Sequence, residues 1–121
     1  MSYKILVVDD EPSIVVPLKF LMEQNGYTVR VAETGEAAVR VIENDPPDLV
    51  LLDIMLPVMD GFQICQAIRE DPERKRTKIV FLTAMGRDVD VAKGMASGAD
   101  AYITKPFANA EVLETIRRLL A

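Results

Sequence analysis

Three short runs of apolar residues, each followed at once by a polar side chain, constrain the fold more than any other feature of this sequence. The runs are Ile5–Val8, Leu49–Leu52 and Ile79–Leu82, and the residues that follow them are Asp9, Asp53 and Thr83. Continuous apolar runs of this length are typical of strands that are buried on both faces of a parallel sheet. The sequence therefore predicts an α/β protein whose central strands end in polar residues.

The segments between these runs have the periodicity of helices. Apolar residues recur three and four positions apart in five stripes: Ile14, Leu18, Leu21 and Met22; Ala38, Val41 and Ile42; Ile64, Cys65 and Ile68; Ala92, Met95 and Ala96; and Val112, Leu113, Ile116, Leu119 and Leu120. We expect Gly26 to follow the end of the first helix, Pro17 to kink that helix, and Asn109 to cap the last one.

Two weaker strands complete the pattern. Residues 27–31 alternate between apolar and polar side chains, which suits a strand at the edge of the sheet, and residues 101–103 form a short fifth strand. Five strand–helix units with right-handed crossovers fold as a doubly wound (βα)5 sheet. A chain of 121 residues fits one such domain, so residues 1–121 are predicted to be a single domain.

Composition excludes several classes of function. The chain has 14 Lys and Arg against 19 Asp and Glu, a formal charge of −5, and an acidic surface is not expected to bind nucleic acid directly. There is no histidine, which excludes histidine-based catalysis and a phosphohistidine on this chain. No apolar run is long enough to cross a membrane, and the first residues lead straight into a strand. Cys65 is the one cysteine of the sequence, so it cannot form a disulfide within the chain. We therefore predict a cytoplasmic protein without a signal peptide.

Polar residues after the predicted strands should gather at one edge of the sheet, where such folds bind ligands. They are Asp9 and Asp10 after the first strand, Asp53 after the third, Thr83 after the fourth and Lys105 after the fifth. Each taken alone has an ordinary interpretation as a cap or turn residue. Together, three carboxylates would repel one another without a cation, and Mg²⁺ prefers oxygen ligands. A carboxylate nucleophile beside a metal, a lysine and a hydroxyl suits phosphoryl transfer.

Four motifs resemble the response-regulator receiver family of two-component signalling, in particular its chemotaxis-regulator-like members. They are Val7–Glu11; Leu51–Asp53 followed by Met55–Gly61; Leu82–Ala84; and Gly98–Phe107. The resemblance extends from about residue 4 to the end of the chain. It implies a flavodoxin-like sheet of five parallel strands in the order 2-1-3-4-5, and it allows a cis bond between Lys105 and Pro106.

The resemblance also implies a role for each site residue. Asp53 matches the phosphoacceptor, and Lys105 matches the lysine that pairs with the phosphoryl group. Mg²⁺ would be held by Asp10 and Asp53 directly, by the backbone carbonyl of Met55, and by Asp9 through water. Thr83 matches the switch hydroxyl, and Tyr102 matches the aromatic residue whose ring position follows it. Access to the site would be controlled by Met55, Ala84 and Met85; because both methionines are bulky and apolar, we expect a long-lived phosphoform.

The resemblance further implies partners. Because the chain has no histidine, the phosphoryl donor must act in trans. The resemblance implies that this donor is a sensor histidine kinase or a histidine phosphotransfer protein, and a small donor such as acetyl phosphate can also serve. The sequence leaves open the downstream protein and whether the chain acts alone or is cut from a longer one. The charged network of winged-helix-type dimers is missing, since the matching positions are Val91, Ala101 and Thr115; that dimer is not expected. Val89 and Val91 can be read as a contact for another partner or as ordinary packing.

Three other functions remain as alternatives. A haloacid-dehalogenase-type hydrolase would need a second acid two residues after the nucleophile, where this chain has Met55, and a cap insertion. A flavin or nucleotide binder would need a phosphate-binding loop after the first strand, where acids stand instead. A receiver that never accepts phosphate would not need the complete acceptor set. We therefore predict a signalling switch that catalyses only its own phosphorylation and dephosphorylation, and not an enzyme with turnover.

Overall fold

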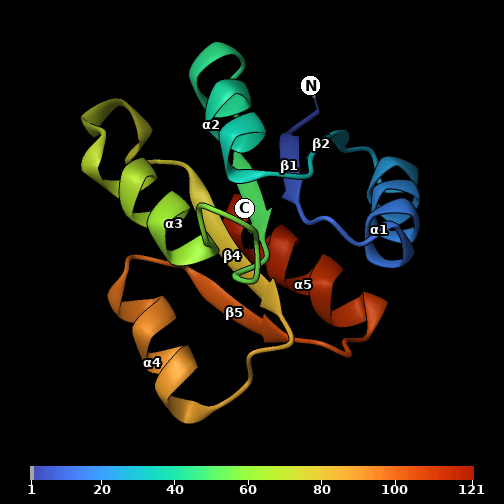
Figure 1. The fold of residues 1–121 in the computed structure, drawn as a ribbon. Helices are drawn as coiled ribbons and strands as arrows, with labels where there is room; N and C mark the ends of the chain where they lie inside the picture. The colour runs from blue at the N-terminus through green and yellow to red at the C-terminus, as the bar shows by residue number, and fades with distance from the viewer. Residues whose placement is uncertain (1) are drawn as a thin grey trace.

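A computed structural model of the protein describes residues 2–121 as a five-stranded parallel sheet between two layers of helices (Figure 1). The strands are β1 (Lys4–Val8), β2 (Thr28–Ala32), β3 (Leu49–Leu52), β4 (Lys78–Thr83) and β5 (Ala101–Thr104). The helices are α1 (Pro12–Gln24), α2 (Gly35–Asn44), α3 (Gly61–Glu70), α4 (Asp88–Ala96) and α5 (Asn109–Leu120), with a single 3₁₀ turn, η1 (Pro72–Arg74), after α3.

The strands are arranged in the order β2-β1-β3-β4-β5, and every neighbouring pair is parallel. This confirms the predicted fold class and strand order, including the edge position of β2. The chain leaves β1 in one direction to form β2 and returns on the other side to form β3. A crevice therefore opens beyond the carboxyl ends of β1 and β3, which is where sheets of this type bind ligands.

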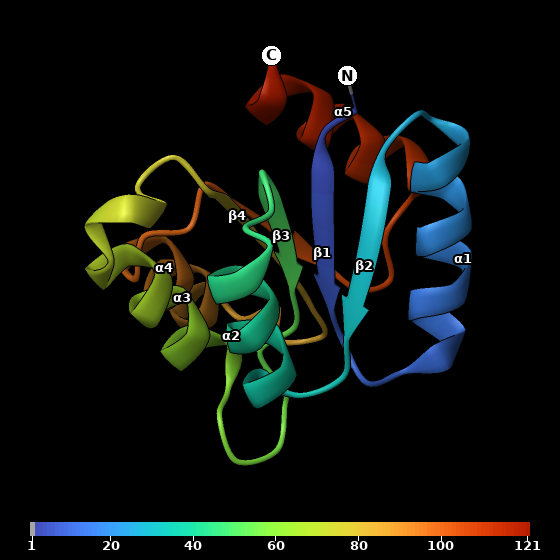
Figure 2. The same cartoon turned by 90° about the horizontal axis from the view of Figure 1, so that it is seen from above.

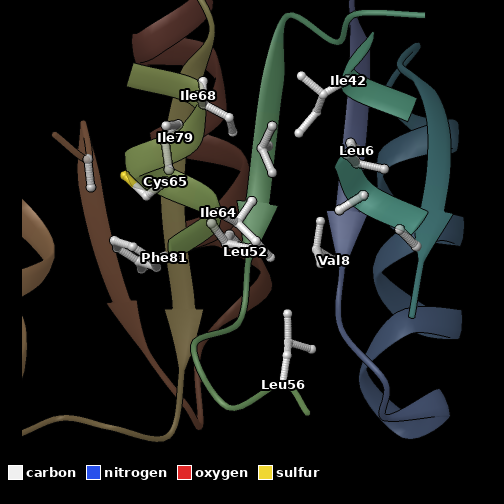
Figure 3. Close-up of a cluster of buried hydrophobic side chains, with 14 of the residues drawn as sticks. Leu6, Val8, Ile42, Leu52, Leu56, Ile64, Cys65, Ile68, Ile79 and Phe81 are labelled. Carbon is white, nitrogen blue, oxygen red and sulfur yellow. The ribbon is translucent and has the colours of Figure 1, made fainter. Parts of the chain in front are cut away.

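Two apolar layers, one on each face of the sheet, hold the helices in place. Helices α1 and α5 cover one face, and α2, α3 and α4 cover the other (Figure 2). Side chains alternate between the layers along each strand, so that Leu6 and Val8 of β1 face the second layer with Leu52, Ile64 and Phe81 (Figure 3). Both faces of β1, β3 and β4 are thus buried, as the continuous apolar runs predicted.

The buried face of α4 differs from the prediction. The sequence pattern placed Ala92, Met95 and Ala96 against the core, but all three are exposed, and Asp90 and Gly94 are the buried residues of this helix. Aromatic rings fill the space beneath α4: a Cβ atom added to Gly94 would lie only 2.9 Å from the ring of Tyr102. A pattern built on apolar side chains cannot find a helix that packs through a glycine.

Smaller predictions had mixed outcomes. Asn109 is the first residue of α5 and not its cap; Ala108 holds the cap position, and its carbonyl accepts hydrogen bonds from the backbone of Glu111 and Val112. Helix α1 runs unbroken through Pro17 and ends before Gly26, which has a φ of 90°. The Lys105–Pro106 bond is cis, and Cys65 is buried and unpaired as expected. Within residues 2–121, none of the helices is long and apolar enough to cross a membrane.

Candidate functional site

Three carboxylates converge where β1 and β3 end side by side. The backbone N–H of Asp9 donates to the Ala32 carbonyl and that of Asp53 donates to the Val8 carbonyl, so each acid is fixed at the end of its strand. One oxygen from each of Asp9, Asp10 and Asp53 lies within 4.8 Å of the other two. Asp9 and Asp53 are buried, whereas Asp10 is exposed to solvent. The predicted cluster therefore forms, with its open side at Asp10.

The loop after β3 fixes the backbone on which Asp53 stands. The N–H of Met55 donates to Oδ1 of Asp53 at 3.2 Å. The loop then turns back, and a Cβ atom added to Gly61 would lie 2.4 Å from the carbonyl oxygen of Asp53. Helix α3 begins at this point with a reciprocal cap, in which the Asp60 carboxylate accepts from the Gln63 N–H and the Gln63 side chain accepts from the Asp60 N–H. Only glycine allows this close approach of the two backbone segments.

Lys105 extends from the end of β5 into the middle of the acids. Its ammonium nitrogen, Nζ, lies 2.9 Å from Oδ2 of Asp9, 3.1 Å from Oε1 of Glu11 and 3.5 Å from Oδ2 of Asp53. The lysine side chain is 10% exposed. Burial lowers the pKa of Lys105, but hydrogen bonds to Asp9 and Glu11 and the charge of Asp53 outweigh that effect and raise it overall. Lys105 is therefore a firmly protonated cation that faces several acids.

Asp9 is the most strongly held of these acids. It accepts hydrogen bonds from Lys105 and, at Oδ1, from the backbone N–H of Glu11 at 3.0 Å. Burial raises the pKa of Asp9 above its usual range, although both hydrogen bonds act in the opposite direction. One lysine does not balance the three clustered carboxylates together with Glu11. An oxygen-only donor set with excess negative charge fits a hard divalent cation such as Mg²⁺.

Thr83 and Tyr102 are joined through the backbone of one residue. The Thr83 hydroxyl is fully buried at the end of β4 and accepts from the Met85 N–H at 3.4 Å. The Tyr102 hydroxyl donates to the Met85 carbonyl, and burial raises the pKa of Tyr102. Of the residues expected to control access, Ala84 and Met55 are exposed and Met85 is half-buried. The two side chains expected to switch are thus connected to each other through the Met85 backbone.

Comparison with known proteins assigns the family. The model of the response regulator receiver domain matches residues 5–117. The chain belongs to this family. It is 42% identical over 120 residues to the alkaline phosphatase synthesis transcriptional regulatory protein PhoP of Bacillus subtilis (strain 168), a match that covers 99% of the chain and 49% of PhoP. The chain therefore spans about half the length of this curated relative.

Solved structures agree with that assignment. The BeF3-activated DrrB receiver domain has a TM-score of 0.90 and 35% identity, with 99% of this chain and 98% of that one covered. A CheY-like response regulator receiver domain protein from Methanospirillum hungatei JF-1 has a TM-score of 0.92 and 32% identity, with 99% and 94% covered. The chain is thus a receiver domain of two-component response regulators, a class of signalling switches, as the sequence motifs predicted.

One residue of this receiver domain received no role from the sequence. Glu11 enters the sequence analysis only as the last residue of the motif Val7–Glu11, yet its carboxylate is one of the partners of Lys105. The run of three acids from Asp9 to Glu11 was the available signal. Among the predicted residues, Lys105 contacts both Asp9 and Asp53, and Asp10 lies in the same cluster. Thr83 and Tyr102 are linked to each other through the backbone of Met85.

Proposed function

We propose that this receiver domain accepts a phosphoryl group on Asp53 from a phosphohistidine of a partner protein. The observation that carries the proposal is the position of Asp53, buried between two further acids and the ammonium group of Lys105. A carboxylate this enclosed by like charges has little structural benefit of its own, because burying an ion costs about 5 kcal/mol before any pairing. A chemical role accounts for that cost.

The two oxygens of Asp53 have different surroundings. Oδ1 accepts from the Met55 N–H, which orients the carboxylate, and Oδ2 faces Lys105 Nζ. In the transfer a carboxylate oxygen forms a bond to phosphorus while the phosphorus–nitrogen bond of the donor breaks, and the electron pair of that bond leaves with the imidazole. Lys105 neutralises charge on the transferred phosphoryl oxygens. Turnover is confined to this step and to hydrolysis of the acyl phosphate, so the domain is a switch.

We propose that the acidic cluster binds Mg²⁺. Asp10 and Asp53 would bind the ion directly, Asp9 through water, and Met55 through its backbone carbonyl. When bound, the cation supplies positive charge against the phosphoryl oxygens. The residues fit this ion because they offer oxygen ligands alone and lie within 4.8 Å of one another. Lys105 already pairs with two of the same acids, so it shares the task of charge balance at the site.

Thr83 and Tyr102 are the residues proposed to change position when Asp53 is phosphorylated. We infer that the Thr83 hydroxyl moves toward the phosphoryl group and that the Tyr102 ring changes position with it. The Met85 backbone, which bonds to both side chains, supports this coupling. Access of water to the acyl phosphate would be set by Met55, Ala84 and Met85, two of which are bulky and apolar, so a long-lived phosphoform is expected.

The partners proposed here are those expected of the receiver family, and the missing histidine means that the donor is another molecule. We propose that the donor is a sensor histidine kinase or a histidine phosphotransfer protein, that the domain acts in the cytoplasm, and that acetyl phosphate is a further donor. A downstream protein or output domain reads the switch. The matched relative is named a transcriptional regulator, but this acidic domain covers about half of it, and we propose no contact with nucleic acid here. A winged-helix-type dimer is not proposed, because Val91, Ala101 and Thr115 carry no charge.

Beryllofluoride, a mimic of the phosphoryl group, tests this function without a partner. The probe is added to the protein with and without Mg²⁺, and unfolding temperature is measured. We expect a rise that needs both Mg²⁺ and beryllofluoride and is lost in Asp53→Asn. Asp88→Asn, an exposed substitution in the first turn of α4, serves as the matched control and should keep the full rise. An equal rise in Asp53→Asn would overturn the proposal.

A further inference from the structure

Helix α4 packs against the sheet through a glycine, Gly94, which has no side chain. A Cβ atom added to Gly94 would lie 2.9 Å from both Cδ2 and Cε2 of Tyr102 and 3.1 Å from Cδ2 of Phe81. A contact below 3.0 Å, such as the one to Tyr102, forces a neighbour to move, and the contact to Phe81 is also tight. The two rings are themselves packed together with centroids 5.7 Å apart. The Tyr102 ring can occupy its present position only because residue 94 is glycine.

The position of this ring is connected to the phosphorylation site. The ring holds its place through the hydrogen bond from its hydroxyl to the Met85 carbonyl, and the Met85 N–H donates to the buried Thr83 hydroxyl. On the far side, Phe81 also packs edge-on against Phe62, with ring centroids 5.5 Å apart. Phe81 therefore has little room to move away, whereas the partly exposed Tyr102 ring can turn outward.

We propose that Gly94 is a positioning residue for the switch, which sets how readily the Tyr102 ring occupies the inner site beneath α4. The proposal rests on the proposed function of Tyr102 and Thr83. A side chain at position 94 raises the free energy of the inner ring position and leaves the outer one untouched. By linkage, a ligand at Asp53 that favours the inner ring position then binds less tightly, because part of its binding free energy is spent against the side chain at position 94. For the same reason, a partner that binds α4 and changes the space beneath Gly94 changes the affinity at Asp53.

The variant Gly94→Ala tests the idea with one methyl group. A general effect on helix stability would be favourable, since alanine is the better helix former. Steric positioning of the ring predicts the reverse for function: weaker binding of beryllofluoride with Mg²⁺, by about tenfold, within the range usual for coupled sites. The same substitution in a Tyr102→Leu background should leave binding unchanged, because the ring it displaces is gone.

A ring-specific readout accompanies the binding measurement. The chain has three tyrosines, so Tyr3→Phe and Tyr27→Phe leave Tyr102 as the single site for fluorotyrosine and one ¹⁹F resonance. We expect Gly94→Ala to shift this resonance toward that of a solvent-exposed tyrosine. An unmoved resonance, or the same loss of binding in both backgrounds, would overturn the proposal.

The outcomes also separate this inference from the proposed function. If the wild type fails to bind beryllofluoride with Mg²⁺, the proposed function fails, while the ¹⁹F shift still decides whether Gly94 positions the ring. If Gly94→Ala does not fold, the steric explanation requires that adding Tyr102→Leu restores folding. A double variant that stays unfolded would show that residue 94 acts on the helix itself and would overturn the proposal.

Discussion

Asp53→Asn should make the metal-free protein more stable, although it removes an ion pair. At an effective dielectric constant of about 20, the attraction between Lys105 Nζ and Asp53 Oδ2, 3.5 Å apart, is roughly 5 kcal/mol. On the same scale the repulsion from buried Asp9, within 4.8 Å, is at least ~3.5 kcal/mol. Exposed Asp10 adds about 1 kcal/mol, since water screens it. These pair energies nearly cancel.

Because the pair energies nearly cancel, desolvation of the Asp53 carboxylate decides whether Asp53→Asn raises or lowers the free energy of unfolding. Burying an ion costs about 5 kcal/mol, and a neutral amide of the same shape avoids most of that cost. Allowing for imperfect hydrogen bonding of the amide, we expect Asp53→Asn to raise the free energy of unfolding by about 1–2 kcal/mol. For a domain of this size that corresponds to an unfolding temperature about 4–8 °C higher.

Thermal and urea unfolding, each with and without Mg²⁺, measure both parts of this prediction. At ten times its dissociation constant, a bound ion stabilises the native state by about 1.4 kcal/mol. Wild type should gain this amount and Asp53→Asn should gain much less. Asp88→Asn, an exposed substitution at the first residue of α4, should stay within about 0.5 kcal/mol of wild type throughout. A metal-free Asp53→Asn protein less stable than wild type, or an equal gain from Mg²⁺ in both, would refute the reasoning.

Three other predictions concern the surroundings of the site. Gly61→Ala should destabilise the fold by about 1–3 kcal/mol in urea unfolding, since its methyl group meets backbone; an unchanged midpoint would show that the loop yields freely. Hydrogen bonds from the Arg87 side chain lower the pKa of Asp90 below its ordinary 3.8, so their contribution is complete above that pH and is lost as the pH falls through the folded-state pKa. The stability difference between wild type and Asp90→Asn should therefore shrink on acidification, and a difference independent of pH would contradict this. Met55→Asn with Met85→Glu should speed dephosphorylation, measured as loss of phosphoprotein over time, and an unchanged rate would remove the role in access.

Much of the fold could be predicted because the strands carry the strongest signal. Apolar runs such as Leu49–Leu52 have no polar face, so they must be covered on both sides, and a parallel sheet with two helical layers follows. The polar residue at each strand end then falls at one edge by topology alone. For this reason the proximity of Asp9, Asp53 and Lys105 could be anticipated, although they lie far apart in the sequence.

The errors arose where packing depends on shape and not on hydrophobicity. Helix α4 was expected to bury Met95, but the space below it is filled by Tyr102 and Phe81, and the helix approaches through Gly94. The pairing of Glu11 with Lys105 depends on where a turn directs one exposed side chain, which no periodicity records. The roles of individual site residues also came from the family resemblance, because a carboxylate at a strand end has the same local signature whether it caps a helix or accepts a phosphoryl group.

The central proposal, phosphorylation of Asp53 with the help of Mg²⁺, is tested most directly by intact-mass spectrometry after incubation with acetyl phosphate. We predict a single labile phosphoryl adduct that requires Mg²⁺, disappears in Asp53→Ala and persists in the control Asp88→Asn. A phosphotransfer assay with a histidine kinase mixture extends the test to the protein donor. An adduct that survives in Asp53→Ala, or a folded protein that binds Mg²⁺ but accepts no phosphoryl group from either donor, would contradict the proposal.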